Sequence, residues 1–78
     1  MQKTAEGMQA SMRQGGKDAA MKYCQDWKRE LEQEGKVLQD KYKKGEIDLK
    51  TYNHNRFTLN QRTADLNGCV SAINKKFG

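Results

Sequence analysis

The sequence of 78 residues has no long hydrophobic run, few metal-binding residues and no block of basic residues. Its longest apolar run, Ala19-Ala20-Met21, is far below the ~20 residues that a membrane-spanning helix requires, so a membrane span is excluded. The segment Met1 to Gly7 contains no apolar stretch of the kind found in secretory signals. Two hypotheses on location follow: a cytosolic protein, or the mature form of an exported one.

Histidine and cysteine are scarce, which limits the metal and redox sites that the chain can form. A structural zinc site takes four nitrogen or sulfur ligands, whereas this chain offers His54, Cys24 and Cys69. His54 is too far from Cys69 along one helix to share a metal ion with it. The two cysteines also lack the Cys-x-x-Cys spacing of a redox pair. We therefore predict no metal and no cofactor.

The arrangements that catalysis requires are also missing. Nucleophilic catalysis needs a serine or cysteine beside a general base, but the single His54 is flanked by two asparagines and is expected on a solvated helix face. Glu30 and Glu34 stand one helical turn apart among basic neighbours, which is typical of surface charges. Gly15-Gly16 precedes Lys17 without the strand and spacing of a phosphate loop. The sequence therefore predicts no catalytic residues and a protein that is not an enzyme.

The basic excess, a formal charge of +5, is scattered along the chain, and no run of basic residues exceeds two. Such a distribution is typical of a solvated surface rather than a nucleic-acid footprint. The basic residues Arg56, Arg62, Lys75 and Lys76 are the ones that could follow phosphates. Arg56 and Arg62, however, are about 120° out of alignment on a helix. A cytosolic basic helical protein that binds nucleic acid is kept as the alternative hypothesis.

What the sequence does contain is two helical patterns on either side of a turn at residues 43–48. The first pattern has apolar side chains at spacings of 4, 3, 4, 7 and 4, and predicts a helix over about 17–44. Its members are Ala20, Cys24, Trp27, Leu31, Leu38 and Tyr42. The second pattern repeats every seven residues, with support from Leu49, Val70 and Phe77, and predicts a helix over about 48–76. Its members are Tyr52, Leu59, Leu66 and Ile73.

The ends of these helices carry matching signals. Gly45 suits the left-handed residue that follows a helix, and Asp48 suits the N-cap of the next one. Residues 1–16 read as a flexible or weakly helical arm, because Gly15 and Gly16 each cost about 1 kcal/mol in a helix. The predicted domains are thus this arm and a helical hairpin over residues 17–78.

The two patterns agree on one antiparallel register. Facing residues of an antiparallel pair have a constant sum of positions, and three pairs share the sum of 93. These pairs are Cys24 with Cys69, Trp27 with Leu66, and Ala20 with Ile73. The predicted fold is therefore all-α, an antiparallel two-helix hairpin with the packing of a coiled coil.

Facing positions would allow Cys24 and Cys69 to form a disulfide, which we predict as the staple of the hairpin. Closing a loop of this length stabilises a fold by about 4 kcal/mol in the chain-entropy model. The alternative is two small buried thiols in a reducing cytosol. If the bridge is native, the compartment is oxidising, and the protein is periplasmic or otherwise exported; if the cysteines are reduced, it is cytoplasmic.

The hydrophobic seam between the helices weakens towards the turn, where Glu34, Asn55 and Arg62 fall at or near seam positions. A chain this short needs a staple, a partner or a second copy. Either the amino-terminal arm covers this region through Met8 and Met12, or a second chain does. A homodimer of two hairpins in a four-helix bundle is one such arrangement.

The segment LQDKYKKGEIDLKTY, residues 38–52, resembles the SHOCT-type helical-hairpin motif. There, a leucine-rich helix ends in Lys-Gly and is followed by an isoleucine, a capping residue and an aromatic that starts the return helix. The resemblance implies a helical hairpin associated with oligomerisation rather than chemistry.

These observations favour a small non-enzymatic binding protein that acts through a helical surface on a protein partner. An exported accessory, exclusion or inhibitor-type protein fits this size and format. The candidate contact residues are Trp27, Tyr42, Tyr52 and Phe57, of which Trp27 is expected to be in the core. Single exposed apolar residues are normal on proteins, but together with a polar seam they indicate a partner that binds a helix face.

Overall fold

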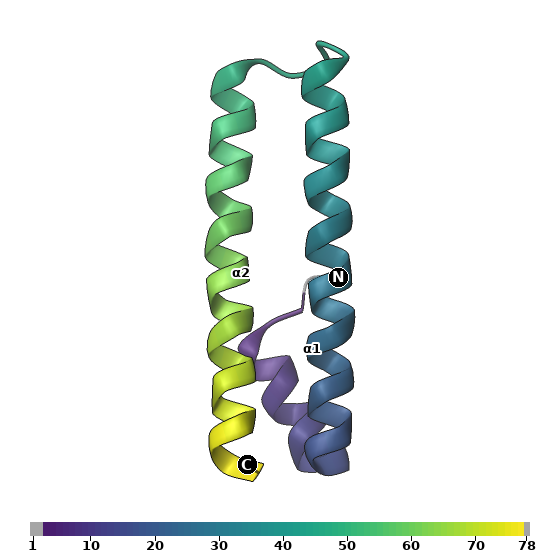
Figure 1. Ribbon diagram of the computed structural model, residues 1–78, viewed down its shortest axis with the longest axis vertical. Helices are drawn as coiled ribbons and strands as arrows, with labels where there is room; N and C mark the ends of the chain where they lie inside the picture. The colour runs from purple at the N-terminus through teal and green to yellow at the C-terminus, as the bar shows by residue number, and fades with distance from the viewer. Residues whose placement is uncertain (1–2, 78) are drawn as a thin grey trace.

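Two long helices lie side by side and antiparallel in the computed structural model, which describes residues 3–77 (Figure 1). Helix α1 spans Ala5–Lys43 and helix α2 spans Leu49–Phe77. The molecule is a rod of 45 × 17 × 16 Å. No β-strand occurs among the described residues. The predicted all-α helical hairpin is thus confirmed.

The turn between the helices is built as the sequence indicates. The backbone N–H groups of Gly45 and Glu46 donate hydrogen bonds of 3.1 and 2.9 Å to carbonyls of the last turn of α1. Gly45 has a φ of +75°, in the left-handed region that favours glycine after a helix. Asp48 accepts a 2.8 Å hydrogen bond from the backbone N–H of Thr51, so it caps the amino end of α2.

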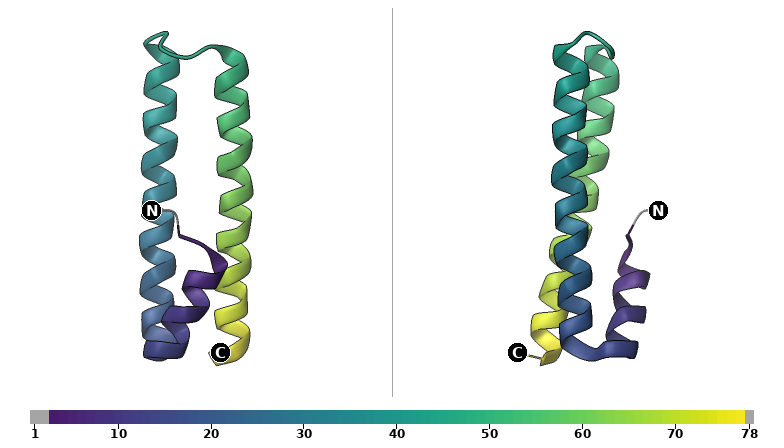
Figure 2. Two further views of the ribbon diagram at one scale, coloured as in Figure 1. Left: turned by 180° about the vertical axis from the view of Figure 1, so that it is seen from behind. Right: turned by 90° about the vertical axis from the view of Figure 1, so that its right-hand side faces the viewer.

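Gly16 divides α1 into two segments. Its φ of 71° and ψ of −152° are not helical, and side chains larger than glycine's rarely adopt them. Residues 5–15 form a short helix, the arm helix, which turns back along one side of the hairpin at the end opposite the turn between α1 and α2 (Figure 2). The helix interruption predicted at Gly15-Gly16 is confirmed. The arm, expected to be either flexible or weakly helical, is helical over residues 5–15.

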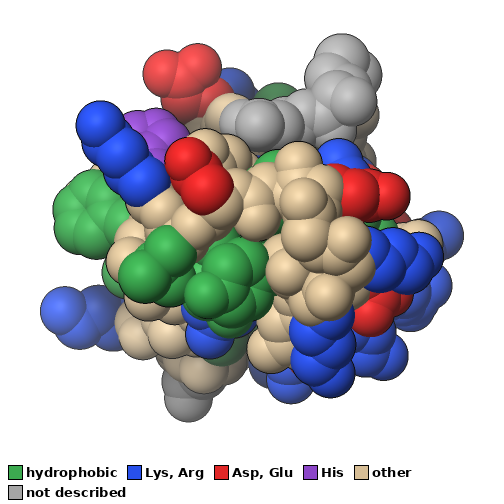
Figure 3. Space-filling view, turned by 90° about the horizontal axis from the view of Figure 1, so that it is seen from above, with side chains coloured by type: hydrophobic (Ala, Val, Ile, Leu, Met, Phe, Trp, Pro, Cys, Tyr) green, Lys and Arg blue, Asp and Glu red, His purple; other side chains and the backbone are tan. Residues whose placement is uncertain are grey.

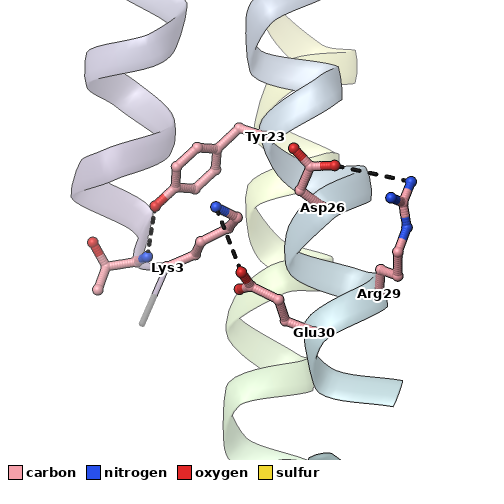
Figure 4. A network of polar contacts seen from close by, with 6 residues as sticks. Lys3, Tyr23, Asp26, Arg29 and Glu30 are labelled. Carbon is pink, nitrogen blue, oxygen red and sulfur yellow. Dashed lines mark hydrogen bonds and ion pairs between the residues drawn. The ribbon is translucent and has the colours of Figure 1, made fainter. Parts of the chain in front are cut away.

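Contacts with Tyr23 and Glu30 fix the arm helix to the rest of α1 (Figure 4). The backbone N–H of Thr4 donates a 2.9 Å hydrogen bond to the Tyr23 hydroxyl, and Lys3 Nζ lies 3.8 Å from Glu30 Oε1. Gly7 approaches the Tyr23 hydroxyl so closely that an added Cβ would collide with it. The arm helix therefore packs in a defined position.

The hydrophobic core lies in the half of the rod near the termini. Eight side chains that are at most 7% exposed form one cluster, and they come from the arm helix, the remainder of α1 and α2. The members are Met8, Ala20, Cys24, Trp27, Leu31, Leu66, Cys69 and Ile73. All three residue pairs that set the predicted register belong to this cluster. Beyond Leu31, α1 contributes only Leu38 to the buried side chains.

The predicted disulfide between Cys24 and Cys69 is wrong for this structure, in which both residues are free thiols. Both are nonetheless buried in the same cluster, 4% and 5% exposed. The hairpin is therefore held by packing of apolar side chains, with the arm helix as a third element, and not by a covalent bridge.

The polar seam towards the turn is closed by an ion pair. Arg62 Nη1 donates a hydrogen bond of 2.6 Å to Glu34 Oε2 across the two helices, and the Arg62 side chain is only 16% exposed. The expectation that the arm covers this region is wrong for the described residues. The reversal at Gly16 places Met8 in the core of the other half, and Lys3 reaches only as far as Glu30.

Candidate functional site

Side chains that bind metals or act as bases are dispersed over the molecule. Within residues 3–77 no three His, Cys, Asp or Glu side chains lie close enough to hold a metal ion. His54 is exposed on α2. In the same described range, neither helix has a stretch long and apolar enough to cross a membrane.

The pKa values of both thiols are raised. Burial raises the pKa of Cys24, and the neighbouring Cys69 raises it further. Burial also raises the pKa of Cys69, with an additional contribution from Asp65. Because the thiolate is the nucleophilic form, both cysteines are poor nucleophiles at neutral pH. Their role in this structure is packing.

Exposed hydrophobic side chains concentrate at the turn end. Among the described residues, five large hydrophobic side chains are exposed, and four of these fall within residues 37–57. They are Val37, Tyr42, Leu49 and Phe57, with exposed fractions of 47, 40, 56 and 60%. The view onto this end shows hydrophobic side chains gathered between charged ones (Figure 3). We call Tyr42, Leu49 and Phe57 the turn-end surface.

The four predicted contact residues take different positions. Trp27 is 1% exposed and packs edge-on against Tyr23, with ring centroids 6.2 Å apart, so it belongs to the core as expected. Tyr42 and Tyr52 stack with centroids 4.7 Å apart and an angle of 26° between the rings. Phe57 is the most exposed of the large hydrophobic residues. The structure thus brings Tyr42 and Tyr52 together and leaves Trp27 inaccessible.

An open groove of about 590 Å³ runs between α1 and α2 on the side where the arm helix lies. Glu30 lies at its edge and also pairs with Lys3, so the groove continues from the place where the arm ends. We call it the arm-side groove. Its lining residues are Glu30, Gln33, Glu34, Val37, Leu38, Lys41, Ile47, Asn55, Thr58, Leu59 and Arg62.

A second groove of about 490 Å³ lies on the other side of the hairpin. Its charged lining residues are Lys28, Glu32, Lys36 and Arg56. Arg56 therefore faces this groove, whereas Arg62 faces the arm-side groove and is bound to Glu34. These two arginines do not share one face of α2, so they cannot follow one phosphate backbone together.

Sequence reasoning missed two features of this region. Leu49 and Phe77 were counted as flanking support for the second helical pattern, but they are 56% and 38% exposed. The signal for Leu49 was available, since it falls outside the seven-residue repeat of the second helix.

Comparisons with protein-family models, with curated proteins and with solved structures found no match to this chain.

Proposed function

We propose that this chain is a small non-enzymatic binding protein that holds a protein partner through its turn-end surface. The observation that carries the proposal is the concentration of exposed hydrophobic side chains at one end of the rod. Leu49 and Phe57 lie eight positions apart on one ridge of α2, which suits contact with an apolar site. Aromatic side chains such as Phe57 and Tyr42 are the usual anchors of protein interfaces.

The charges around this surface indicate the chemistry of the partner. Residues 40–57 hold five Lys or Arg and three Asp or Glu. Opposite charges at the rim of an interface speed association and disfavour wrong partners. The partner surface that fits is an apolar patch with an acidic rim.

An exported inhibitor-type role depended on a disulfide, which the structure does not contain. Free buried cysteines are the usual state in a reducing compartment. Free thiols thus support a cytoplasmic site for the proposed interaction, and an exported form is the alternative proposal.

The experiment compares two substitutions of phenylalanine at opposite ends of α2. Phe57→Ser removes the most exposed anchor of the turn-end surface, and Phe77→Ser is the matched control. Tagged wild-type and variant proteins are expressed in the source cells, and captured proteins are quantified by mass spectrometry. We expect a protein that the wild type and Phe77→Ser retain and Phe57→Ser loses. Equal retention by all three proteins would contradict the proposal.

A further inference from the structure

The arm helix packs on the same side of the hairpin as the arm-side groove, next to the end of the groove at Glu30. In the half near the termini, the arm helix packs on this side through Met8, Tyr23 and Glu30. Beyond Glu30 the same groove continues towards the turn without a covering segment among residues 3–77. Among the described residues, the polar seam between α1 and α2 is thus left uncovered on the side of the arm-side groove.

The side of α1 that faces this groove carries a heptad pattern. Tyr23, Glu30, Val37 and Lys44 recur every seven residues, and the first two contact the arm. From Glu30 onwards the spacing is 4, 3, 4 and 3, as in the contact seam of a coiled coil. We call these five positions, all of them exposed, the α1 stripe; four of them line the arm-side groove, and Lys44 is the C-cap that follows α1. Its members are Glu30, Glu34, Val37, Lys41 and Lys44.

The order of charges along the α1 stripe is self-complementary. Two acidic residues come first, the apolar Val37 stands at the centre, and two lysines follow. In an antiparallel pair of such stripes, Val37 meets its own copy. Glu34 then meets Lys41 of the second copy, and Glu30 meets Lys44 of the second copy.

We infer that a second copy of this chain docks antiparallel in the arm-side groove, with the two-fold axis at Val37. Opposite charges then face each other at all four outer positions of the paired stripes. Within each chain Glu30 also pairs with Lys3 and Glu34 with Arg62, so in the dimer each carboxylate would be shared between two cations. An interface of this kind is isologous, since both copies contribute the same surface. The result is a four-helix bundle formed by the two turn halves.

The geometry leaves room for this arrangement. Residues 30–44 extend over about 21 Å at 1.5 Å per residue. With the axis at Val37, the turn of the second copy arrives at Glu30 of the first. That is the level of Lys3, the first described residue, so among residues 3–77 no segment of the arm covers the groove beyond it.

The exposed area of the chain matches what such an interface requires. Its accessible surface is 5868 Å², whereas a compact monomer of 9.0 kDa exposes about 4,900 Å². The excess of about 1,000 Å² is close to the ~800 Å² that each partner buries in a standard interface.

The groove on the opposite side does not offer the same pairing. Lys28, Lys36 and Arg56 outnumber the single acidic Glu32 among its lining charges. Two copies joined there would bring like charges together, which is unfavourable. On the arm-side groove, α2 contributes the uncharged Asn55 and Thr58, and Arg62 is already neutralised by Glu34.

The first test uses charge reversal and sedimentation equilibrium. The wild type is expected to reach twice the chain mass of 9.0 kDa as concentration rises. Two double variants are compared: Glu30→Lys with Glu34→Lys, and Lys41→Glu with Lys44→Glu. In a dimer of either variant, like charges meet at each of the four outer positions of the paired α1 stripes. We expect the dimer Kd of each to rise by about tenfold or more. An equimolar mixture of the two should associate again, because every pair is then opposite in sign.

The control for the lysine double variant is Lys28→Glu with Lys36→Glu, which makes the same change of net charge in the opposite groove and should leave the dimer intact. Far-UV circular dichroism checks that each variant is helical. A wild type that stays monomeric, a mixture that does not associate, or equal loss in the control would overturn the inference. A monomeric wild type would leave the turn-end proposal standing, because Leu49 and Phe57 do not line this groove.

A cross-linking test covers the case in which a charge variant fails to fold. Val37→Cys places a thiol at the two-fold axis, and Asp40→Cys places one on α1 outside the groove. A short bismaleimide should join two Val37→Cys chains and not two Asp40→Cys chains. Cross-linking of Asp40→Cys alone, or of neither variant, would overturn the arrangement.

Discussion

The hydroxyl of Tyr23 accepts a 2.9 Å hydrogen bond from the backbone N–H of Thr4, nineteen positions earlier in the chain. Thr4 is also the N-cap of the arm helix, where its side chain accepts a hydrogen bond from the N–H of Gly7. The same tyrosine ring lies edge-on to Trp27. One side chain thus joins the start of the arm to the centre of the core.

We expect Tyr23→Phe to loosen the arm without unfolding the hairpin. The variant keeps the ring and removes the acceptor, and a hydrogen bond of this kind contributes about 0.5–1.5 kcal/mol. Urea unfolding followed by the fluorescence of Trp27, the only tryptophan, measures the loss. Tyr42→Phe is the control, because its ring stacks on Tyr52 at the turn, and it should change stability less than Tyr23→Phe does.

Met8→Ala should destabilise the protein substantially, because Met8 is 2% exposed in the core cluster. Removing a buried methionine side chain typically costs about 2–5 kcal/mol. Trp27 should then emit at longer wavelength, since water gains access to the indole. Met12→Ala, which alters a half-buried neighbour of the cluster, should have a smaller effect. Equal effects of the two substitutions would argue against Met8 as the anchor of the arm.

Gly16→Ala tests the reversal of the chain. Alanine rarely adopts a φ of 71° with a ψ of −152°, and holding it there costs about 1–3 kcal/mol. We expect lower stability and increased proteolysis of residues 3–16. Gly68→Ala is the matched control, because Gly68 lies within α2 with open space around an added Cβ. That change should stabilise the helix by about 0.5–1 kcal/mol, and a stabilising Gly16→Ala would contradict the kink.

The buried thiols predict a specific pH dependence of stability. Burial raises the folded-state pKa of Cys24 and Cys69 above the ordinary value of 9.0. The unfolded chain therefore releases these protons at lower pH than the folded one. The stability that the neutral thiols contribute is complete below about pH 9 and is lost as pH rises through the folded-state pKa values.

Urea unfolding at pH values from about 7 to 10 measures this loss. The double variant Cys24→Ala with Cys69→Ala is the control, and its stability should depend less on alkaline pH than that of the wild type. Iodoacetamide should label the native wild type slowly and the urea-unfolded chain rapidly. Rapid labelling of the native protein would contradict the burial of the thiols.

The hairpin was predictable because two independent periodic patterns agreed on one register. Cys24, Trp27 and Ala20 pair by position with Cys69, Leu66 and Ile73, and all six are buried in one cluster. The turn was predictable for a local reason. Gly45 and Asp48 satisfy backbone groups at helix ends, which depends on a few neighbouring residues only.

The arm and the redox state were not predictable in the same way. Residues 5–15 contain two well-spaced methionines but little other apolar pattern, so their helix depends on packing against Tyr23 and the core. The sequence placed Cys24 and Cys69 in one region but does not determine whether their sulfurs bond. In the sequence, Arg62 interrupts the hydrophobic seam. In the structure, its ion pair with Glu34 bridges the two helices.

The confinement of the core to one half of the rod divides the molecule into parts of unequal local stability. Backbone amides of α1 and α2 near Trp27 and Ile73 should exchange with deuterium only on global unfolding, while those beside the turn open more readily. Substitutions near the turn should therefore have little effect on the free energy of global unfolding. The surface at the turn can therefore change its side chains while the scaffold beneath it persists.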